Sequence, residues 1–358
     1  MKKQLFSFAL VLALVMTLTA CGGNTGTPMN DGSVAGGTPN RPADSPQDNN
    51  PPTDLEETPV NDFEYKYDAD TQGVMITKYT GTSIKVRIPD KIDDEPVTSI
   101  GRGAFSDSGI MSVYLPSTVK VIGGGAFSKC TGLTNIVIPN NVIEIGSDAF
   151  FSCEGLTSIV IPDSVTEIGS GAFRSCEKLT AVTIGNSVAT IGNDAFKDCI
   201  GLTSIVIPNG VTEIGNGAFR NCKELSSIVI PDSVTMIGKE AFYGCSGLTS
   251  ITLLDGLTSI GSQAFYGCLG LTSITLPDGL TRIGSKAFYG CTGLTTITIP
   301  DGVTNLEKDA LALAMVAMAP GASPSLGFQI TYKGVTIDLY NYGGLPSDAP
   351  PEFQELFN

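Results

Sequence analysis

The chain has 358 residues, a formal net charge of -15 and no histidine or tryptophan, and 42% of its residues are hydrophobic. The missing histidine removes the commonest general base and metal ligand of proteins. The acidic balance excludes nucleic acid as a partner, because the phosphates would be repelled. The hydrophobic content is enough for a sizeable core.

Residues 1–20 have the pattern of a secretory signal peptide: two lysines, an almost unbroken apolar run from Leu5 to Leu18, and small residues before Cys21. A transmembrane anchor is the alternative, but the apolar run is too short to span a bilayer comfortably. The ending Leu18-Thr19-Ala20-Cys21 resembles the lipobox of bacterial lipoproteins. That resemblance implies cleavage before Cys21 and a diacylglyceryl thioether on its sulfur. We therefore expect a lipid anchor on the extracellular face of the bacterial cell membrane.

Residues 21–62 are predicted to form a disordered tether. From Gly22 to about Pro59 the sequence is mainly Gly, Pro, Asn, Asp and Thr, and such a composition cannot bury enough apolar surface to offset its ordering entropy. A flexible chain of this length would have a mean reach of about 30–40 Å. It would hold the folded part away from the membrane; the alternative is a leader whose length has no role.

The chain repeats with a fixed period between residues 63 and 311. The pair Ala-Phe recurs first after 22 residues and then every 23, and Ala310-Leu311 keeps the register. Cysteine follows the same period. A fixed period of this length predicts a solenoid, in which no unit buries its apolar face alone and neighbours must stack. The repeated residues are Phe105, Phe127, Phe150, Phe173, Phe196, Phe219, Phe242, Phe265 and Phe288, and Cys130, Cys153, Cys176, Cys199, Cys222, Cys245, Cys268 and Cys291.

The unit between Cys153 and Phe173 shows how one coil is built. Ile159 and Ile161 are two residues apart and face the same way in a short strand, which Pro162 helps to end. The chain then returns through Ile168 and closes the core with an alanine and a phenylalanine. An Ile-Gly pair such as Ile168-Gly169 recurs in every unit, which indicates a backbone position that needs a positive φ or a close approach of the chain.

The pattern Cys-x2-Leu-x2-Ile-x-Ile-Pro-x2-Val-x2-Ile-Gly-x2-Ala-Phe-x2-Cys resembles the BspA-like branch of bacterial leucine-rich repeat surface proteins. The resemblance covers about residues 63–311. It implies an α/β-type leucine-rich repeat solenoid with short parallel strands, 23-residue coils and terminal caps. It also implies exposure at the cell surface and a role in protein binding or adhesion, without implying one particular ligand.

Both ends of the solenoid are predicted to carry caps that shield open sheet edges. Residues Phe63 to Tyr79 alternate aromatic, apolar and polar side chains, which indicates a hairpin over the first coil. Residues 312–358 are expected to form the C-terminal cap and tail. They would begin with a capping helix over Leu311 to Ala319, too short to span a membrane, and continue with a hairpin from Phe328 to Tyr340 that turns at Lys333-Gly334.

Two kinds of side chain that recur with the repeat, the cysteines and a set of acids and amides, could have a chemical role. The cysteines lack histidine and Cys-x-x-Cys partners, which argues against metal, and eight equivalent thiols argue against catalysis. Disulfides remain an alternative in an exported protein, but side chains in one column point the same way, which favours a buried ladder of free thiols. A second column of acids and amides suits calcium or, more simply, turn geometry; it comprises Asp163, Asn186, Asn209, Asp232, Asp255, Asp278 and Asp301.

Recognition is expected at the variable position after each Ala-Phe pair. Tyrosine is favoured at binding hot spots, although stacked tyrosines can also simply pack against one another. A strand-exposed column that includes Ser158 and Ser204 is small and polar. With Val206 and its equivalents beside it, this face would be smooth, and it could accept a broad partner surface or nothing. The candidate partner-binding residues are Arg174, Lys197, Arg220, Tyr243, Tyr266 and Tyr289.

We therefore expect a non-catalytic, lipid-anchored surface protein that mediates protein-protein interaction or adhesion. The alternative is a surface lipoprotein that binds polysaccharide. The expected partners are a protein or glycan on another cell or in the matrix, and the membrane through the lipid on Cys21, with no cofactor, metal or nucleic acid. The sequence has no nucleophile elbow, Walker loop or strand-coupled dinucleotide fingerprint, so an enzyme is a remote third interpretation.

Overall fold

The computed structural model describes residues 55–307, 309–311, 328–339 and 351. They belong to one compact unit, Gln47–Asn358. The expected signal peptide, Cys21 and most of the expected tether lie outside the described residues, as does the expected capping helix beyond Leu311. Within the part that is described, no helix has the length and apolarity needed to cross a membrane.

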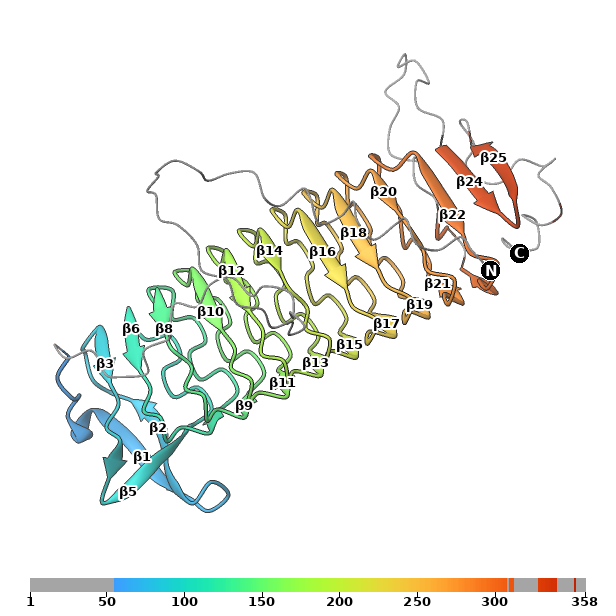
Figure 1. Cartoon of the computed structure of the whole chain (residues 1–358). Coiled ribbons are helices and arrows are strands. Elements are labelled where there is room, and N and C mark those ends of the chain that lie inside the picture. Colours follow the sequence, from blue (N-terminus) through green and yellow to red (C-terminus); the bar gives the residue numbers. More distant parts are fainter. Residues whose placement is uncertain (1–54, 308, 312–327, 340–350, 352–358) are drawn as a thin grey trace, which may run out of the picture. The chain divides into compact units, whose positions relative to one another are not determined.

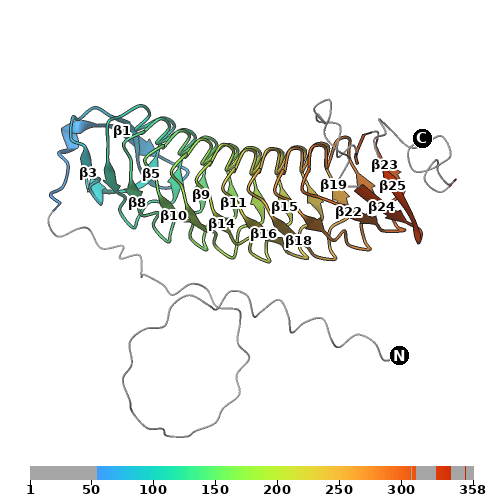
Figure 2. The same cartoon turned by 90° about the horizontal axis from the view of Figure 1, so that it is seen from above.

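The repeats form a solenoid of parallel coils that follow one another in sequence order (Figures 1 and 2). The first column of strands is a thirteen-stranded sheet in the order β1-β2-β5-β7-β9-β11-β13-β15-β17-β19-β21-β23, with β4 paired to β5. Its strands are β1 (Phe63–Asp68), β2 (Gly73–Tyr79), β4 (Lys91–Ile92), β5 (Glu95–Ile100), β7 (Val121–Ile122), β9 (Glu144–Ile145), β11 (Glu167–Ile168), β13 (Thr190–Ile191), β15 (Glu213–Ile214), β17 (Met236–Ile237), β19 (Ser259–Ile260), β21 (Arg282–Ile283) and β23 (Asn305–Leu306).

The second column of strands contains the sequence segment that was expected to be extended. It consists of three sheets, in the orders β3-β6-β8, β10-β12-β14-β16-β18-β20 and β22-β24-β25. Its strands are β3 (Lys85–Arg87), β6 (Ser112–Tyr114), β8 (Asn135–Ile136), β10 (Ser158–Val160), β12 (Ala181–Thr183), β14 (Ser204–Ile205), β16 (Ser227–Ile230), β18 (Ser250–Leu253), β20 (Ser273–Ile274), β22 (Thr296–Ile299), β24 (Phe328–Tyr332) and β25 (Val335–Leu339).

The expected parallel pairing is confirmed, and the register equals the sequence period. Ile168 pairs with Ile145 in the preceding coil and with Ile191 in the next. The return path of each coil is itself a short strand, so the coil has two strands where the sequence indicated one. Residues at equivalent positions of the repeat therefore stack directly above one another in both columns.

The prediction of an α/β-type solenoid is wrong in one respect: the described coils contain strands and turns but no α-helix. The chain after each Ile-Gly pair is a series of turns, and among the described residues the helix with defined bounds is the 3-10 helix η1 (Val60–Asp62). Left-handed backbone explains the absence of a helix: Gly171 has φ 65° and Ser175 has φ 59°. Two such residues so close together reverse the chain before a helical turn can propagate.

The recurring glycine after isoleucine is explained by close approach and not by a positive φ. A Cβ on Gly169 would lie 2.6 Å from the carbonyl carbon of Gly146 and 2.6 Å from the carbonyl oxygen of Ile145. These distances are far below van der Waals contact, so a larger residue would push neighbouring coils apart. The left-handed position lies two residues later, at Gly171.

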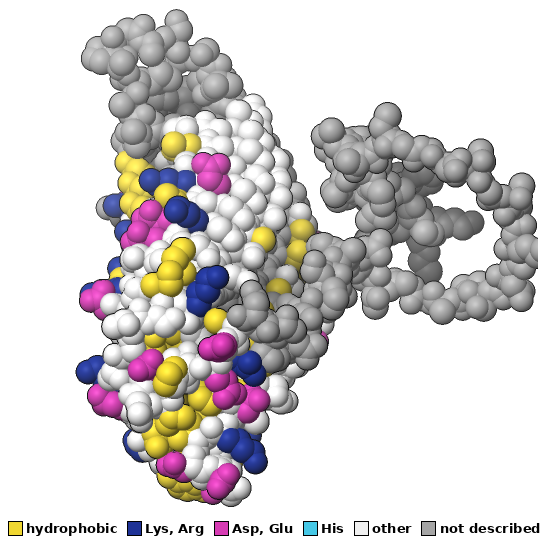
Figure 3. Space-filling view, turned by 90° about the vertical axis from the view of Figure 1, so that its left-hand side faces the viewer, with side chains coloured by type: hydrophobic (Ala, Val, Ile, Leu, Met, Phe, Trp, Pro, Cys, Tyr) yellow, Lys and Arg dark blue, Asp and Glu magenta, His cyan; other side chains and the backbone are white. Residues whose placement is uncertain are grey.

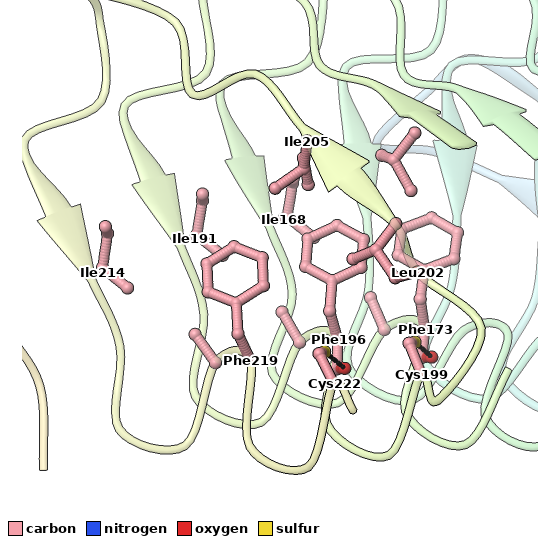
Figure 4. Close-up of a cluster of buried hydrophobic side chains, with 14 of the residues drawn as sticks. Ile168, Phe173, Ile191, Phe196, Cys199, Leu202, Ile205, Ile214, Phe219 and Cys222 are labelled. Carbon is pink, nitrogen blue, oxygen red and sulfur yellow. Dashed lines mark hydrogen bonds between the residues drawn. The ribbon is translucent and has the colours of Figure 1, made fainter. Parts of the chain in front are cut away.

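The core is one continuous column of side chains between the two strand columns (Figure 4). The repeated phenylalanines are fully buried, and successive rings stack with centroids 5.1 to 5.5 Å apart from Phe105 to Phe288. Stacked aromatic pairs add about 0.5–1.5 kcal/mol beyond their area burial. Each coil is therefore stabilised chiefly by its two neighbours.

Both expected hairpins are found. Strands β1 and β2 pair antiparallel and extend the larger sheet beyond the first coil. Strands β24 and β25 also pair antiparallel and continue from β22, with Lys333 and Gly334 at φ 47° and 75° in the turn. The folded part starts slightly before residue 63, because Thr58 exchanges two hydrogen bonds with the backbone of Arg87, each 3.0 Å long.

Candidate functional site

The turn after each buried phenylalanine presents one variable side chain, and these side chains form a column that we call the turn column. The left-handed residue that follows fixes its direction. The backbone N–H of Ser175 donates to the carbonyl of Lys197 in the next coil at 2.7 Å, and that of Asn221 donates to the carbonyl of Tyr243 at 2.7 Å. The turn column comprises Ser128, Phe151, Arg174, Lys197, Arg220, Tyr243, Tyr266 and Tyr289, all of them half-buried.

The three tyrosines at the end of the column stack face to face. The ring centroids of Tyr243 and Tyr266 are 4.6 Å apart with a 4° angle between the planes, and those of Tyr266 and Tyr289 are 4.9 Å apart with a 14° angle. The ring faces therefore contact one another and leave edges and hydroxyls toward solvent. Partial burial raises the pKa of the Tyr266 hydroxyl above its ordinary value of 10.0, so it is a neutral hydrogen-bond donor at physiological pH.

The arginines of the turn column are positioned by contacts with aromatic rings of neighbouring coils. The guanidinium of Arg220 lies 4.5 Å from the centroid of the Tyr243 ring and also pairs with the carboxylate of Glu240. The guanidinium of Arg174 lies 5.5 Å from the centroid of Phe151. Cations over aromatic faces gain about 0.5–2 kcal/mol, depending on desolvation.

Acidic neighbours offset the positive charge that the sequence placed in the middle of the column. Lys197 lies 3.6 Å from a carboxylate oxygen of Asp194, and Arg220 pairs with the carboxylate of Glu240. The side chain of Lys197 is only 19% exposed. These acids were missed from the sequence, although they share one position in the repeat, three residues before the turn column.

The structure brings all six candidate partner-binding residues onto one face of the turns, with Arg220 joining the basic and aromatic parts through Tyr243. It also adds Phe151 as the partner of Arg174. Cys21, the expected lipidation site, lies outside the described residues.

The cysteine column is buried and reduced. All eight repeat cysteines are free, and each thiol donates to the carbonyl of the phenylalanine one coil back, with sulfur-oxygen distances of 3.0 to 3.2 Å. Burial raises the pKa of the Cys245 thiol from 9.0 to about 12, and it raises that of Cys222 well above 9.0. Such thiols are poor nucleophiles at neutral pH.

The column of acids and amides behaves as turn structure where its contacts are defined. A carboxylate oxygen of Asp163 accepts a hydrogen bond from the backbone N–H of Asn186 in the next coil at 2.7 Å. Among the described residues, no group of three or more His, Cys, Asp or Glu side chains converges as a metal site would require. The Asp163 contact is the kind of hydrogen bond that the turn interpretation expects.

Comparison with known proteins identifies the family. The sequence model described as the BspA type leucine rich repeat region matches in six copies over residues 98–226 and 212–316. These matches span more than half of the chain, so the chain belongs to the BspA-type leucine-rich repeat family. No curated protein sequence matches it.

Solved structures give similar proteins. A leucine-rich repeat protein of T. pallidum is 35% identical, covering 60% of this chain and 91% of that one, with a TM-score of 0.47. A leucine-rich cell surface protein of Faecalibacterium prausnitzii is 30% identical, covering 72% and 86%, with a TM-score of 0.44. The pneumococcal vaccine antigen PcpA is 23% identical, covering 67% and 72%, with a TM-score of 0.45.

Proposed function

We propose that the chain is a lipid-anchored, non-catalytic protein of the bacterial cell surface that binds a protein partner through the turn column. Membership of the BspA-type family and the cell-surface description of the F. prausnitzii relative support the location. The apolar run that ends at Cys21 supports the anchor. The turn column supports the binding role, because it gathers Arg and Tyr side chains on one rigid face.

The stacking within the turn column favours a protein partner over a polysaccharide. A sugar-binding platform needs a free aromatic face, but Tyr266 has a neighbouring ring on each side. The edges and hydroxyls that remain suit hydrogen bonds to a polar protein surface, and the rigid rings lose little side-chain entropy on binding. This occupation of the ring faces is the observation that carries the proposal.

Saturable binding of the full chain to candidate partner cells tests the binding role. We expect binding to be lost when the cells are treated with protease and retained when they are treated with glycosidases. Replacing Arg174, Lys197, Arg220 and Tyr266 with alanine together should weaken binding at least tenfold. The matched control replaces Leu269, an exposed residue outside the column. Unchanged binding of the fourfold variant would exclude this face, and loss after glycosidase treatment would favour the polysaccharide alternative.

A separate experiment tests the anchor. The wild-type chain, produced in a bacterial host, should fractionate with membranes, and Cys21→Ser should release it because the thioether cannot form. Membrane retention of the Cys21→Ser chain at the wild-type level would contradict the lipid anchor without affecting the binding role.

A further inference from the structure

The sequence contains two Asn-Gly dipeptides, Asn209-Gly210 and Asn216-Gly217, and one coil carries both. An asparagine followed by glycine can lose its side-chain nitrogen without an enzyme. The next backbone nitrogen attacks the side-chain amide carbon, and glycine has no Cβ to crowd the attack. The reaction needs a side chain and a backbone N–H that are free to approach one another. The two dipeptides differ in this respect, so the fold selects between them.

The Asn216-Gly217 dipeptide is held by the next coil. The side-chain oxygen of Asn216 accepts a hydrogen bond from the backbone N–H of Lys239 at 2.7 Å. The backbone N–H of Gly217, which would be the nucleophile, donates to the carbonyl of Lys239 at 2.8 Å. Gly217 is also buried and left-handed, with φ 63°. An attack on the amide of Asn216 would first have to break both hydrogen bonds, so the folded chain protects this dipeptide.

The Asn209-Gly210 dipeptide lies at the centre of an exposed turn. The backbone N–H of Val211 donates to the carbonyl of Pro208 at 3.0 Å and closes the turn. The two central residues, Asn209 and Gly210, are both exposed. Within the described part of the chain, neither the side chain of Asn209 nor the backbone N–H of Gly210 has a hydrogen-bond partner. The amide carbon and the nucleophilic nitrogen are therefore close in the chain, solvated and free of the bonds that hold Asn216.

Packing between coils favours glycine at position 210. A Cβ on Gly210 would lie 2.7 Å from the carbonyl oxygen of Asn186 in the preceding coil. This distance is well below van der Waals contact, so a residue without a side chain suits the stacking of the coils. The same lack of a side chain leaves the backbone nitrogen of Gly210 open to Asn209. The reactive dipeptide is thus a consequence of how closely the coils pack.

We propose that Asn209 is a site of spontaneous deamidation in the folded chain and that Asn216 is not. The backbone nitrogen of Gly210 forms a bond to the side-chain amide carbon of Asn209, and the bond from that carbon to Nδ2 breaks. The proton that Gly210 loses leaves with Nδ2 as ammonia, and a cyclic succinimide remains. Water then opens the ring at either carbonyl and gives aspartate or isoaspartate at position 209. The reaction is independent of the proposed partner binding, which uses the turn column.

The two products differ in what they do to the solenoid. Aspartate suits the turn, because the equivalent residue of the next four coils is an aspartate: Asp232, Asp255, Asp278 and Asp301. Isoaspartate routes the main chain through the side-chain methylene and so lengthens it between Pro208 and Val211, which are both buried. Each product also adds one negative charge to a surface on which charge is unevenly spread. Figure 3 shows a broad area with almost no charged side chains beside a band where charges are frequent.

Incubation of the full chain in warm, mildly alkaline buffer, followed by peptide mapping over time, tests the inference. Cleavage after Glu213 places Asn209 and Asn216 in separate peptides, and the mass gain and isoaspartate content of each peptide are measured. In the folded chain we expect Asn209 to react at least tenfold faster than Asn216. In a chain held unfolded in urea the two rates should become similar, because the hydrogen bonds from Asn216 and Gly217 to Lys239 are then lost.

The matched variants are Asn209→Gln and Asn216→Gln, because glutamine keeps the amide but sets it one methylene further from the backbone nitrogen. Asn209→Gln should abolish the product in its own peptide, which also contains Asn186 and Asn193, and Asn216→Gln should leave the rate at Asn209 unchanged. Thermal unfolding establishes that each variant is folded. Equal rates at the two asparagines of the folded chain, a faster reaction at Asn216, or a preference for Asn209 that is just as large in urea would each overturn the inference.

Discussion

The thiol of Cys222 donates a hydrogen bond to the backbone carbonyl of Phe196, one coil back, with 3.2 Å between sulfur and oxygen (Figure 4). The same carbonyl accepts the backbone N–H of Cys199 in its own coil at 3.2 Å. Cysteine therefore serves as a small buried side chain that also satisfies a carbonyl between coils. This contact explains why phenylalanine and cysteine follow the same period.

The repeat thiols should be inert in the folded chain and free when it unfolds. All eight are buried, and burial raises the pKa of Cys222 and Cys245, so little thiolate forms at these two positions at pH 8. In Ellman titration without reductant, the native chain should show almost no reaction of the eight repeat cysteines, and the denatured chain should show all eight. A small yield from the denatured, unreduced chain would mean that the column is oxidised, contrary to the structure.

Alkaline pH should destabilise the solenoid. A thiol whose folded pKa is raised favours the folded state below its unfolded pKa of about 8.5, and this contribution is lost as pH rises toward the folded value. Burial raises the pKa of Cys245 to about 12, so the Tm should fall progressively above about pH 9. Cys245→Ala should make that fall shallower while lowering the Tm at pH 7. A Tm profile with the same alkaline slope in both chains would contradict this account.

Interrupting the phenylalanine column should weaken the whole solenoid. Phe196 is fully buried, with ring centroids 5.4 Å from Phe173 and 5.5 Å from Phe219. Phe196→Ala should cost about 3–5 kcal/mol of unfolding free energy, measured by urea denaturation. Tyr266→Ala, in the half-buried turn column, serves as the comparison and should cost clearly less. Equal costs would show that burial of the column is not the main source of stability.

The glycine after isoleucine should tolerate no side chain. A Cβ on Gly215 would lie 2.7 Å from the backbone nitrogen of Asn193 and 2.9 Å from the carbonyl oxygen of Ile191. Gly215→Ala should therefore destabilise the chain by about 1–3 kcal/mol through overpacking. The control is Gly109→Ala, where nothing lies within 4 Å of the added carbon, and its Tm should stay close to that of the wild type. A matching loss of Tm in the two variants would refute the close-approach explanation.

The N-terminal hairpin should be sensitive to acid through Asp68. The Thr71 hydroxyl, with help from that of Ser99, donates to this carboxylate and lowers its pKa below the ordinary 3.8. A lowered folded pKa contributes stability above the unfolded pKa of about 3.9, and that stability is lost as pH falls below it. Asp68→Asn should lower the Tm at pH 7 and reduce its dependence on pH between 5 and 3. Asp255→Asn, an exposed change, should alter neither; a wild-type acid profile in Asp68→Asn would remove Asp68 as the cause.

The sequence by itself determined the solenoid, its period and the residues of its core. Phe173, Cys176 and Ile168 recur every 23 residues, and only stacking of the coils can bury such a pattern. The sequence also predicted both hairpins. The turn residues Lys333-Gly334 and the alternating side chains after Phe63 indicate a hairpin within a short segment, without information from distant residues. What it could not give was the backbone between Gly169 and Cys176, where Ser175 is left-handed although serine does not indicate a positive φ.

Only the tertiary structure decided what the surface columns do. Whether Arg220 is a free cation or a stacked, ion-paired one depends on Glu240 and Tyr243 in the next coil, and a single coil carries no information about that contact. The same holds for Val206 and Val229, two exposed residues that become neighbours only when their coils are adjacent. Periodic burial is a property of the repeat, but contact between unlike neighbours depends on the stacked order of the coils.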